Sequence, residues 1–247
     1  MDRKIRVGAV SYLNTKPLIY GFEQGMMKDE IELVIDYPAN IADALIAGKI
    51  DIGLIPVAAL PQMKEYYIIG DYCIGCDGPV ASVCLFSEVP LDQIETVLLD
   101  YQSRTSVLLV KILLKEYWKI NPVLISANAG YENSVTGTTA AVIIGDRALK
   151  KRIESNYTFD LGQYWKAYTG LPFLFAAWVS RKPLTEKFIF DFNQATGYGL
   201  KNIENVIAEN PYPYFDLNKY YSFFLKYNLD ELKRKGLKQF LNKIENL

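Results

Sequence analysis

Short runs of β-branched apolar residues alternate with helical patterns in the first part of the chain, and this alternation constrains the fold most. Residues 5–10, 32–36 and 51–56 predict strands, because each is a brief apolar run of the kind found in buried parallel sheets. Residues 18–22 and 39–48 carry apolar side chains at helical spacing. A strand–helix–strand order indicates parallel strands joined by right-handed crossovers, so we predict an α/β fold.

A second strand–helix series begins near residue 90. Residues 96–100, 123–125 and 140–144 predict three further strands, and an apolar helix follows the first of them. From about residue 184 the chain is predicted to be mostly helical, with one break at the proline-rich stretch 210–214.

Two long apolar runs, residues 79–86 and 171–180, stand between these parts of the chain. We therefore expect two lobes joined by two crossover strands, with an interlobe cleft that closes by a hinge motion. Lobe I would comprise residues 1–88 and 180–247, and lobe II residues 89–179. A single doubly wound sheet is the alternative architecture for a chain of about this length.

Composition limits the classes of function. The chain has 247 residues and a net charge of −1, which gives no broad basic field for nucleic acid or an anionic membrane. No apolar stretch reaches the roughly 18 residues that a membrane span needs, and no apolar signal-peptide core precedes the first strand. We therefore expect a cytoplasmic protein, and the three cysteines suit such a reducing compartment.

Histidine is absent from the chain. This removes the commonest general base, the commonest metal ligand and every serine–histidine or cysteine–histidine pair. The Cys73-Ile74-Gly75-Cys76 motif lies in a predicted turn without a second ligand pair, so we interpret its cysteines as incidental. No dinucleotide or ATP loop motif is present, so we expect neither a metal nor a cofactor.

The first predicted strand ends in a polar stretch, SYLNTKP. Ligands of open α/β sheets sit outside the carboxyl ends of the strands. Five side chains of this stretch are therefore candidate binding residues: Ser11, Tyr12, Asn14, Thr15 and Lys16. A helix cap followed by a polar turn would also explain Asn14 or Thr15.

A second donor-rich stretch, Ser103-Arg104-Thr105-Ser106, follows a predicted strand and opens a helix. The N–H groups and dipole of a helix N-terminus favour an anion, and arginine can hold a carboxylate through two hydrogen bonds. A capping serine beside a surface arginine is the alternative. Together, the two stretches would place donors on both walls of a cleft, which suits a small dianion.

Four further residues are candidates around the expected cleft. Ser82 would point into the cleft if its apolar run is the hinge, and would otherwise be a buried serine bonded to backbone. Asp146 would line the cleft or cap a helix. Pro56 ends the third predicted strand, and Phe173 belongs to an aromatic-rich stretch whose rings can pack on an unsaturated ring.

Several blocks, in order along nearly the whole chain, resemble the chorismate dehydratases of the futalosine route to menaquinone. The blocks are VGAVSYLNTKPL (7–18), DIGLIP (51–56), GPVASV (78–83), SRTS (103–106), IGD (144–146) and GLPFLFA (170–176), of which the first is the most specific. The resemblance implies an α/β, two-lobed, periplasmic-binding-protein-like (type II) fold. It also implies dehydration of chorismate to 3-[(1-carboxyvinyl)oxy]benzoate in the cytoplasm, without a metal or nucleotide.

The resemblance also implies roles for the candidate residues. Chorismate is a dianion whose own enolpyruvyl carboxylate can take the ring proton, so the absence of histidine is tolerable. Asn14 would orient that carboxylate or the leaving hydroxyl, and Ser11 would assist it. Arg104 would grip a carboxylate together with the neighbouring Ser and Thr hydroxyls.

Two other functions stay open at this point. A sister enzyme of the same route, which cleaves a dehypoxanthine futalosine ring, is expected to use a histidine, and this chain has none. A small-anion solute-binding or sensor protein would have the same fold, because fold alone does not decide function. The sequence is compatible with a monomer or a homodimer.

Overall fold

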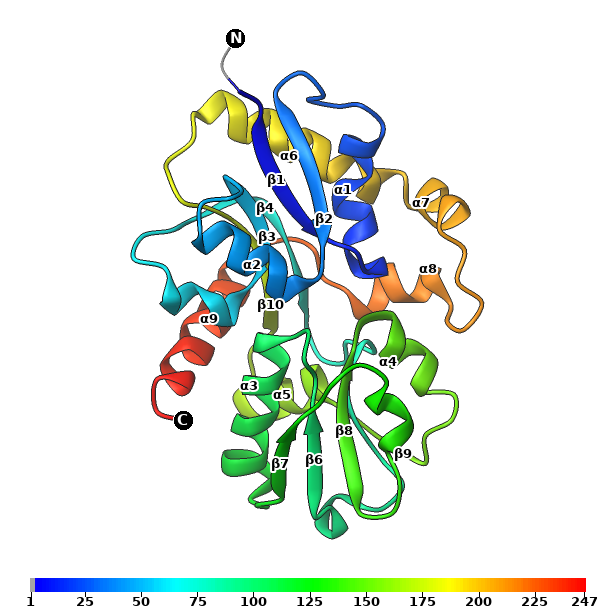
Figure 1. Ribbon diagram of the computed structural model, residues 1–247. Coiled ribbons are helices and arrows are strands. Elements are labelled where there is room, and N and C mark those ends of the chain that lie inside the picture. The colour runs from blue at the N-terminus through cyan, green and yellow to red at the C-terminus, as the bar shows by residue number, and fades with distance from the viewer. Residues whose placement is uncertain (1–2) are drawn as a thin grey trace.

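The computed structural model describes residues 3–247. Its strands form two five-stranded sheets, and Figure 1 shows one sheet in each of two lobes. The first sheet holds β1 (Ile5–Val10), β2 (Ile31–Asp36), β3 (Ile52–Pro56), β4 (Tyr67–Cys76) and β10 (Phe173–Ser180) in the order β2-β1-β3-β10-β4. β1 runs parallel to β2 and β3, as the strand–helix–strand pattern predicts, whereas β10 runs antiparallel to β3 and β4.

The second sheet forms lobe II. It holds β5 (Val83–Ser87), β6 (Thr96–Leu99), β7 (Val123–Ser126), β8 (Thr139–Ile144) and β9 (Tyr157–Asp160) in the order β7-β6-β8-β5-β9. β6 runs parallel to β7 and β8, and β5 runs antiparallel to β8 and β9. The helices of this lobe are α3 (Arg104–Ile112), continued by a π-helical turn (Leu113–Trp118), α4 (Gly145–Lys151) and α5 (Leu161–Thr169).

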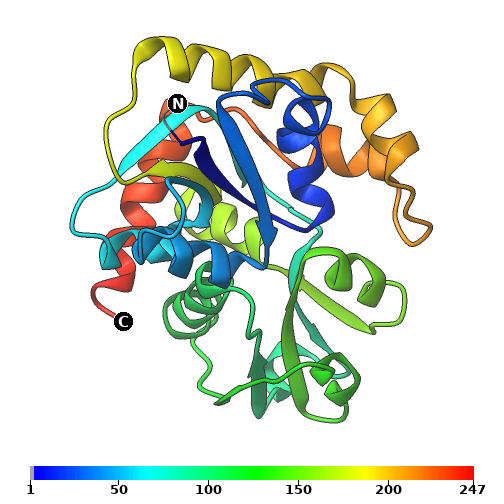
Figure 2. The ribbon, with the colours of Figure 1, turned by 45° about the horizontal axis from the view of Figure 1, so that its top comes forward.

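The helices of lobe I come from both ends of the chain. They are α1 (Lys16–Glu23), α2 (Pro38–Ile46), α6 (Glu186–Lys201), α7 (Ile203–Glu209), α8 (Leu217–Lys219) and α9 (Glu231–Ile244). Short 3-10 or π turns also matter for the site: η1 (Leu13–Thr15), η2 (Val57–Gln62) and η6 (Tyr220–Phe224). Figure 2 shows α6 lying across the end of lobe I beside α1.

Two glycines allow α1 and α6 to pack closely. A Cβ atom on Gly21 would lie 2.1 Å from the carbonyl oxygen of Ala195, and one on Gly199 would lie 2.2 Å from that of Pro17. Any larger side chain at either position would force the helices apart. The close packing brings the C-terminal part of the chain against the first strand–helix unit, where the candidate site begins.

The chain changes lobes earlier than the predicted boundaries after residues 88 and 179. β5 belongs to the sheet of lobe II and β10 to the sheet of lobe I, so residues 77–82 and 170–172 make the two crossings. Each apolar run thus ends in a strand within one sheet, and only its first residues connect the lobes. An apolar run indicates burial, but its partner strand decides which sheet contains it. Likewise, Cys73 and Cys76 lie in β4 instead of a turn.

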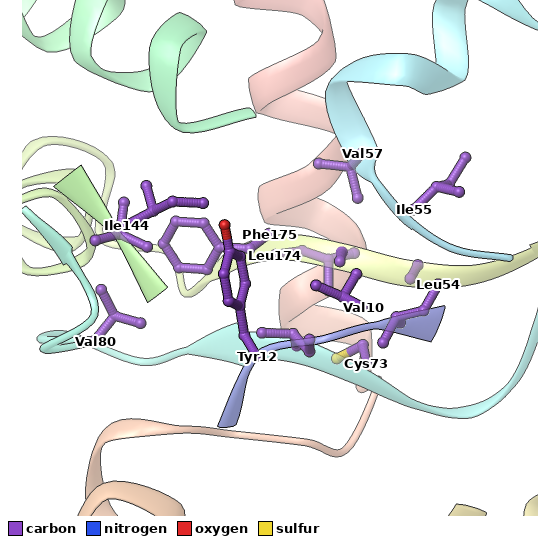
Figure 3. Packing of buried hydrophobic residues seen from close by; sticks show 14 of the residues in the cluster. Val10, Tyr12, Leu54, Ile55, Val57, Cys73, Val80, Ile144, Leu174 and Phe175 are labelled. Atoms are coloured by element: carbon purple, nitrogen blue, oxygen red, sulfur yellow. The ribbon is translucent and has the colours of Figure 1, made fainter. Parts of the chain in front are cut away.

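A continuous hydrophobic core joins the two lobes. Figure 3 shows side chains of this cluster around the crossing segments, with Tyr12 beside Phe175 and Val10. Ile144 from lobe II and Val80 from the first crossing belong to the same cluster. Cys73, Cys76 and Cys84 are buried, and burial raises the pKa of each thiol above its ordinary value. Within residues 3–247, no helix has the length and apolar character that a membrane crossing requires.

Candidate functional site

A cavity lies between the two lobes. It encloses about 500 Å³ of space free of protein atoms, a figure that includes the open solvent at its mouth. Its polar lining residues are Tyr12, Asn14, Ser82, Ser103, Thr105 and Ser106, and its other lining residues are Val10, Pro38, Pro56, Ile74, Val80, Val83, Ile144, Gly145, Phe175 and Ala176. Side chains of both lobes meet there, and every lining side chain is uncharged.

The η1 turn forms the lobe I wall of this cavity. It connects the carboxyl end of β1 to α1, and Pro17 in the first turn of α1 favours the helix start. The half-buried side chain of Asn14 accepts a hydrogen bond at Oδ1 from the hydroxyl of Thr15, at 3.2 Å. Its Nδ2 group has no acceptor among the described residues. An amide donor at the cavity surface is therefore free for a ligand.

The backbone around Asn14 is fixed by three side chains. Asp146 accepts a hydrogen bond from the N–H of Leu13 at 3.0 Å. The hydroxyls of Tyr221 and Tyr227 donate to the carbonyl oxygens of Leu13 and Asn14, at 3.1 and 2.9 Å. The turn is thus held from outside while the Asn14 side chain faces the cavity.

The start of α3 forms the lobe II wall. Ser103 caps the helix, because its Oγ accepts the N–H of Ser106 at 3.1 Å, and its hydroxyl donates to Ser106 Oγ at 2.8 Å. Thr105 reaches across to lobe I, where its hydroxyl donates to the carbonyl of Phe175 and accepts the N–H of Ala58, both at 3.2 Å. These hydroxyls are partly committed to protein partners. Apart from that of Ser106, which Ser103 caps, the first-turn N–H groups of the helix have no intrahelical acceptor and add donors to this wall.

Ser82 enters the cavity lining from the first crossing segment. Ala81 before it adopts φ = +63°, a left-handed conformation that costs a non-glycine residue about 1–2 kcal/mol. The buried carboxylate of Asp160 holds this turn by accepting the N–H groups of Val80 and Ala81, at 3.0 and 2.8 Å. Backbone strain retained beside a cavity is typical of a functional site.

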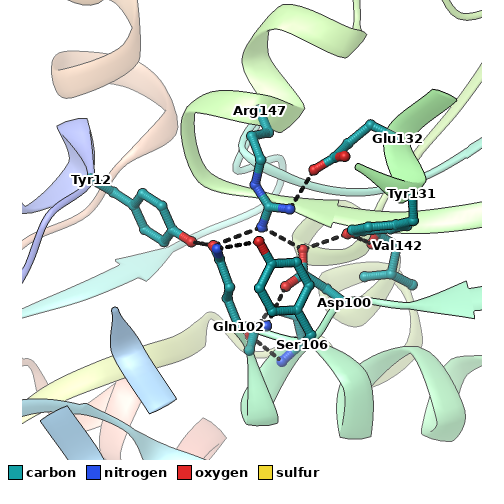
Figure 4. A network of polar contacts seen from close by, with 10 residues as sticks. Tyr12, Asp100, Gln102, Ser106, Tyr131, Glu132, Val142 and Arg147 are labelled. Carbon is teal, nitrogen blue, oxygen red and sulfur yellow. Dashed lines mark hydrogen bonds and ion pairs between the residues drawn. The ribbon is translucent and has the colours of Figure 1, made fainter. Parts of the chain in front are cut away.

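A polar network extends from the cavity into lobe II (Figure 4). The guanidinium of Arg147 donates to Asp100 at 2.8 Å, to Gln102 Oε1 at 2.9 Å and to Glu132 at 2.5 Å. Burial raises the pKa of Asp100, although the nearby Arg147 guanidinium opposes that shift. The hydroxyl of Tyr12 donates to Gln102 Oε1, so the lobe I side of the cavity is bonded to this network.

The structure brings seven of the predicted site residues to the cavity surface. They are Tyr12, Asn14, Pro56, Ser82, Ser103, Thr105 and Ser106. All lie at the carboxyl ends of β1 and β3, in the first crossing or at the start of α3. The rule that ligands sit at strand ends therefore located both walls.

Three other predicted residues of the first polar stretch lie outside the cavity lining. Ser11 is exposed, and its backbone N–H donates to the carbonyl of Asp36 at 3.3 Å. Thr15 is buried and supports Asn14 through its hydroxyl. Lys16 pairs with Glu23, two turns further along the same face of α1, at 3.5 Å. None of these three side chains is therefore placed to contact a ligand in the cavity.

Arg104, Asp146 and Phe173 also lie outside the lining. Arg104 points along the surface and pairs with Asp43 of α2 at 2.6 Å, so it spans the lobes without entering the cavity. Asp146 turns toward the backbone of Leu13.

Phe173 lies in the core, with ring centroids 5.1 Å from both Trp165 and Phe240. Phe175, two residues further along β10, reaches the cavity instead. The two rings pack against each other with centroids 4.6 Å apart, and the register of β10 against β4 shifts between Leu174 and Ala176, on either side of Phe175. A strand pattern alone reveals neither this shift nor which ring meets the cavity. Sequence reasoning therefore chose the aromatic block but missed the ring that lines the site.

The electrostatics of the site centre on Asp146. Burial raises the pKa of this carboxyl to about 6, although the hydrogen bond from Leu13 and the charges of Arg147 and Lys16 lower it. Within residues 3–247, no group of three or more Cys, Asp or Glu side chains is arranged to hold a metal ion.

Comparison with known proteins adds a family and a fold. Residues 5–246 match a protein family described as menaquinone biosynthesis. A chorismate dehydratase of Thermus thermophilus is 27% identical over 267 aligned positions, which include 95% of this chain and 93% of that protein.

Solved structures share the architecture at lower identity. A crystal structure of a protein from Archaeoglobus fulgidus aligns with a TM-score of 0.75 and 17% identity, over 98% of this chain and 97% of that one. The periplasmic aliphatic sulphonate binding protein of Escherichia coli aligns with a TM-score of 0.67 and 16% identity, over 100% of this chain and 88% of that one. These likenesses confirm the predicted α/β, periplasmic-binding-protein-like fold.

Proposed function

The chain belongs to the menaquinone biosynthesis family, and from this premise we propose that it is a chorismate dehydratase, a hydro-lyase of the futalosine route. The reaction would eliminate water from chorismate and give 3-[(1-carboxyvinyl)oxy]benzoate. The family match and the Thermus thermophilus chorismate dehydratase support this proposal. The observation that carries it in this chain is an interlobe cavity with polar donors on both walls and an apolar lining between them.

The cavity suits the chemistry of chorismate. The substrate carries two carboxylates on a cyclohexadiene ring, and the cavity offers Asn14 on one side and the start of α3 on the other. Neutral donors and a helix N-terminus can hold a carboxylate, so no arginine is needed in the lining. Phe175, Val10 and the other apolar residues provide a surface against which the ring can pack.

The driving force of the reaction lies in the substrate. A proton leaves the ring carbon that bears the enol ether and hydroxide leaves the neighbouring carbon, so the net loss is one molecule of water. The electron pair of the broken C–H bond completes an aromatic ring. The protein must therefore position the reacting groups and exclude bulk water, rather than supply a strong acid or base.

The proton acceptor in this proposal is the enolpyruvyl carboxylate of the substrate, because the chain has no histidine. The free amide of Asn14 would orient that carboxylate or the leaving hydroxyl. Ser82 would add a hydroxyl from the crossing segment, in the place first expected for Ser11, which is exposed. Donors preset in this way stabilise developing charge without reorganisation.

Incubation of the purified protein with chorismate tests the proposal. Proton NMR should show the ring signals of chorismate replaced by those of a meta-substituted benzoate that retains the enolpyruvyl group. Chorismate incubated without protein, and with the Asn14→Ala variant, controls for its spontaneous breakdown. If chorismate is converted no faster with the protein than in buffer alone, the proposal is overturned.

A small-anion binding or sensor protein is the second candidate, because the periplasmic aliphatic sulphonate binding protein shares this fold. The same sample distinguishes the two: chorismate that binds, measured by calorimetry, but is not converted favours a binding protein. The sister cyclase is the weaker alternative, since the chain has no histidine. Turnover of a dehypoxanthine futalosine, but not of chorismate, would favour it.

A further inference from the structure

The three bonds that fix the Asn14 turn come from two different lobes. Tyr221 and Tyr227 lie on the C-terminal segment that follows α8. That segment is bound to the sheet of lobe I, where the N–H of Cys73 donates to the carbonyl of Tyr227 at 2.7 Å. Asp146 belongs to α4 of lobe II. Of these three bonds, only the one from Leu13 to Asp146 crosses the cleft.

Asp146 is itself joined to lobe I at two atoms. Its Oδ1 accepts the Leu13 N–H at 3.0 Å, and its carbonyl oxygen accepts the hydroxyl of Tyr212 at 2.5 Å. Gly145 before it adopts φ = +62° and lies so close to Tyr12 that a Cβ atom would be 3.1 Å from that ring. The start of α4 is thus shaped to meet the η1 turn when the lobes are together.

The Asp146 carboxylate is placed to act on backbone rather than on a ligand. It does not line the cavity, and a carboxylate there would repel a dianionic substrate. The two nearby cations bond to other groups. Arg147 bonds to Asp100, Gln102 and Glu132. Lys16 pairs with Glu23. Among the described residues, the Asp146 carboxylate accepts a hydrogen bond from the backbone N–H of Leu13, the residue before Asn14.

We propose that Asp146 is a positioning residue that fixes the Asn14 turn from the opposite lobe and so makes the turn competent only when the cleft is closed. This inference rests on the proposed function. A hinge motion that opens the cleft would break the Leu13–Asp146 bond, while the bonds of Tyr221 and Tyr227 would persist. Closure over the substrate and alignment of Asn14 become one event, because one side chain serves both.

Two substitutions of Asp146 separate position from charge. Asp146→Ala removes the acceptor and should lower kcat about 10-fold or more, since small misplacements of a reacting group are costly. The Kd of the product should change by a smaller factor than kcat does, because Asp146 does not line the cavity that would hold the ligand. Asp146→Asn keeps an oxygen that can accept the Leu13 N–H, so it should restore most of the kcat.

Asp230→Ala is the matched control. Asp230 also accepts a backbone N–H at a helix start, that of Lys233 at 2.8 Å, but it lies at α9 away from the cavity. Its loss should leave kcat unchanged. Hydrogen exchange of the Leu13 amide, measured with product bound, gives a readout that does not require turnover, and it should be faster in Asp146→Ala than in wild type.

The outcomes distinguish this inference from the proposed function. Wild-type protein that fails to convert chorismate overturns the function, whereas the exchange rate of the Leu13 amide still tests the role of Asp146 with chorismate as the ligand. An Asp146→Ala variant with wild-type kcat or wild-type exchange overturns the inference. So does an Asp146→Asn variant as slow as the alanine variant, because the charge and not the bond would then matter.

Discussion

The two walls of the cleft are built from similar residues but use them differently. On the lobe I wall, bonds from outside hold the backbone of the η1 turn, and the amide of Asn14 is left free. On the lobe II wall, the hydroxyl of Ser103 bonds to Ser106, and that of Thr105 bonds to Phe175 and Ala58 of lobe I. Two donor-rich stretches can thus differ in what they leave open: one keeps a side-chain donor unpaired at the cavity, and the other commits its hydroxyls to protein partners.

The largest effect is expected at Asn14. Asn14→Ala should reduce kcat by at least ~10²-fold, as the loss of an oxyanion donor does, because in the proposed function the free amide positions the reacting groups. Steady-state kinetics with chorismate measures it. Ser106→Ala is the matched control on the other wall, and we expect it to cost less than about 10-fold, because its hydroxyl bonds to Ser103. Equal losses at both positions would erase the difference between the walls.

A pH effect is expected where the two walls meet, at Asp146. Burial raises the pKa of its carboxyl to about 6 in the folded protein, whereas its ordinary value is 3.8. The stabilisation from this raised pKa is complete below pH 4 and is lost as the pH rises through about 6. Asp146→Asn does not titrate, so wild type should lose about 2–3 kcal/mol of stability relative to this variant between pH 4 and 7.

Thermal unfolding of both proteins at several pH values measures this difference. Asp230→Asn controls for a general effect of removing one acidic side chain, because the Lys233 ammonium and backbone lower the pKa of Asp230 against the effect of burial. A wild-type protein that gains stability over Asp146→Asn as the pH rises would show that the Asp146 carboxylate is favoured in its ionised form.

The lobe II wall should respond mainly in stability. Thr105→Val removes a buried hydroxyl and leaves the N–H of Ala58 and the carbonyl of Phe175 without this partner. We expect a loss of roughly 1–3 kcal/mol in the free energy of unfolding, with kcat of the folded protein within about threefold of wild type. Denaturant titration measures the first value. A stable variant with a collapsed kcat would instead place Thr105 in the chemistry.

The smallest effect is expected at Arg104. The sequence predicts a carboxylate clamp there, but the guanidinium pairs with Asp43 on the surface. Exposed ion pairs contribute about 0–1 kcal/mol, so Arg104→Ala should change KM for chorismate less than about threefold. Asp43→Ala, which breaks the same pair from the other side, should behave alike. A KM that rises tenfold or more in Arg104→Ala alone would restore the clamp.

The sequence predicted the positions of the walls better than the direction of their side chains. Strand ends locate ligand sites in open α/β sheets, and by this rule Asn14 and Thr105 were expected at the cavity that they line. Ser82, which also lines the cavity, was expected there only if its apolar run is the hinge. It could not tell that Ser11 faces solvent or that Arg104 runs along the surface. Those directions depend on partners such as Asp43, which lies 61 residues away in the chain.

Local sequence patterns could not predict the lobe boundaries or the tyrosine contacts either, because both depend on partners that are distant in the chain. The apolar sequences of β5 and β10 would suit either sheet, and only their pairing with distant strands decides which sheet contains each. Tyr221 and Tyr227 act on a turn more than 200 residues before them, as the separations of 208 and 213 residues show. A helical pattern with scattered tyrosines gives no signal of such a role.

A structure of the protein with the dehydration product bound tests the central claim most directly. We predict that the benzoate ring lies in the interlobe cavity against Phe175, with one carboxylate within hydrogen-bond distance of the Asn14 amide and the other at the start of α3. Product bound outside this cavity, or with both carboxylates beyond the reach of Asn14, would contradict the account.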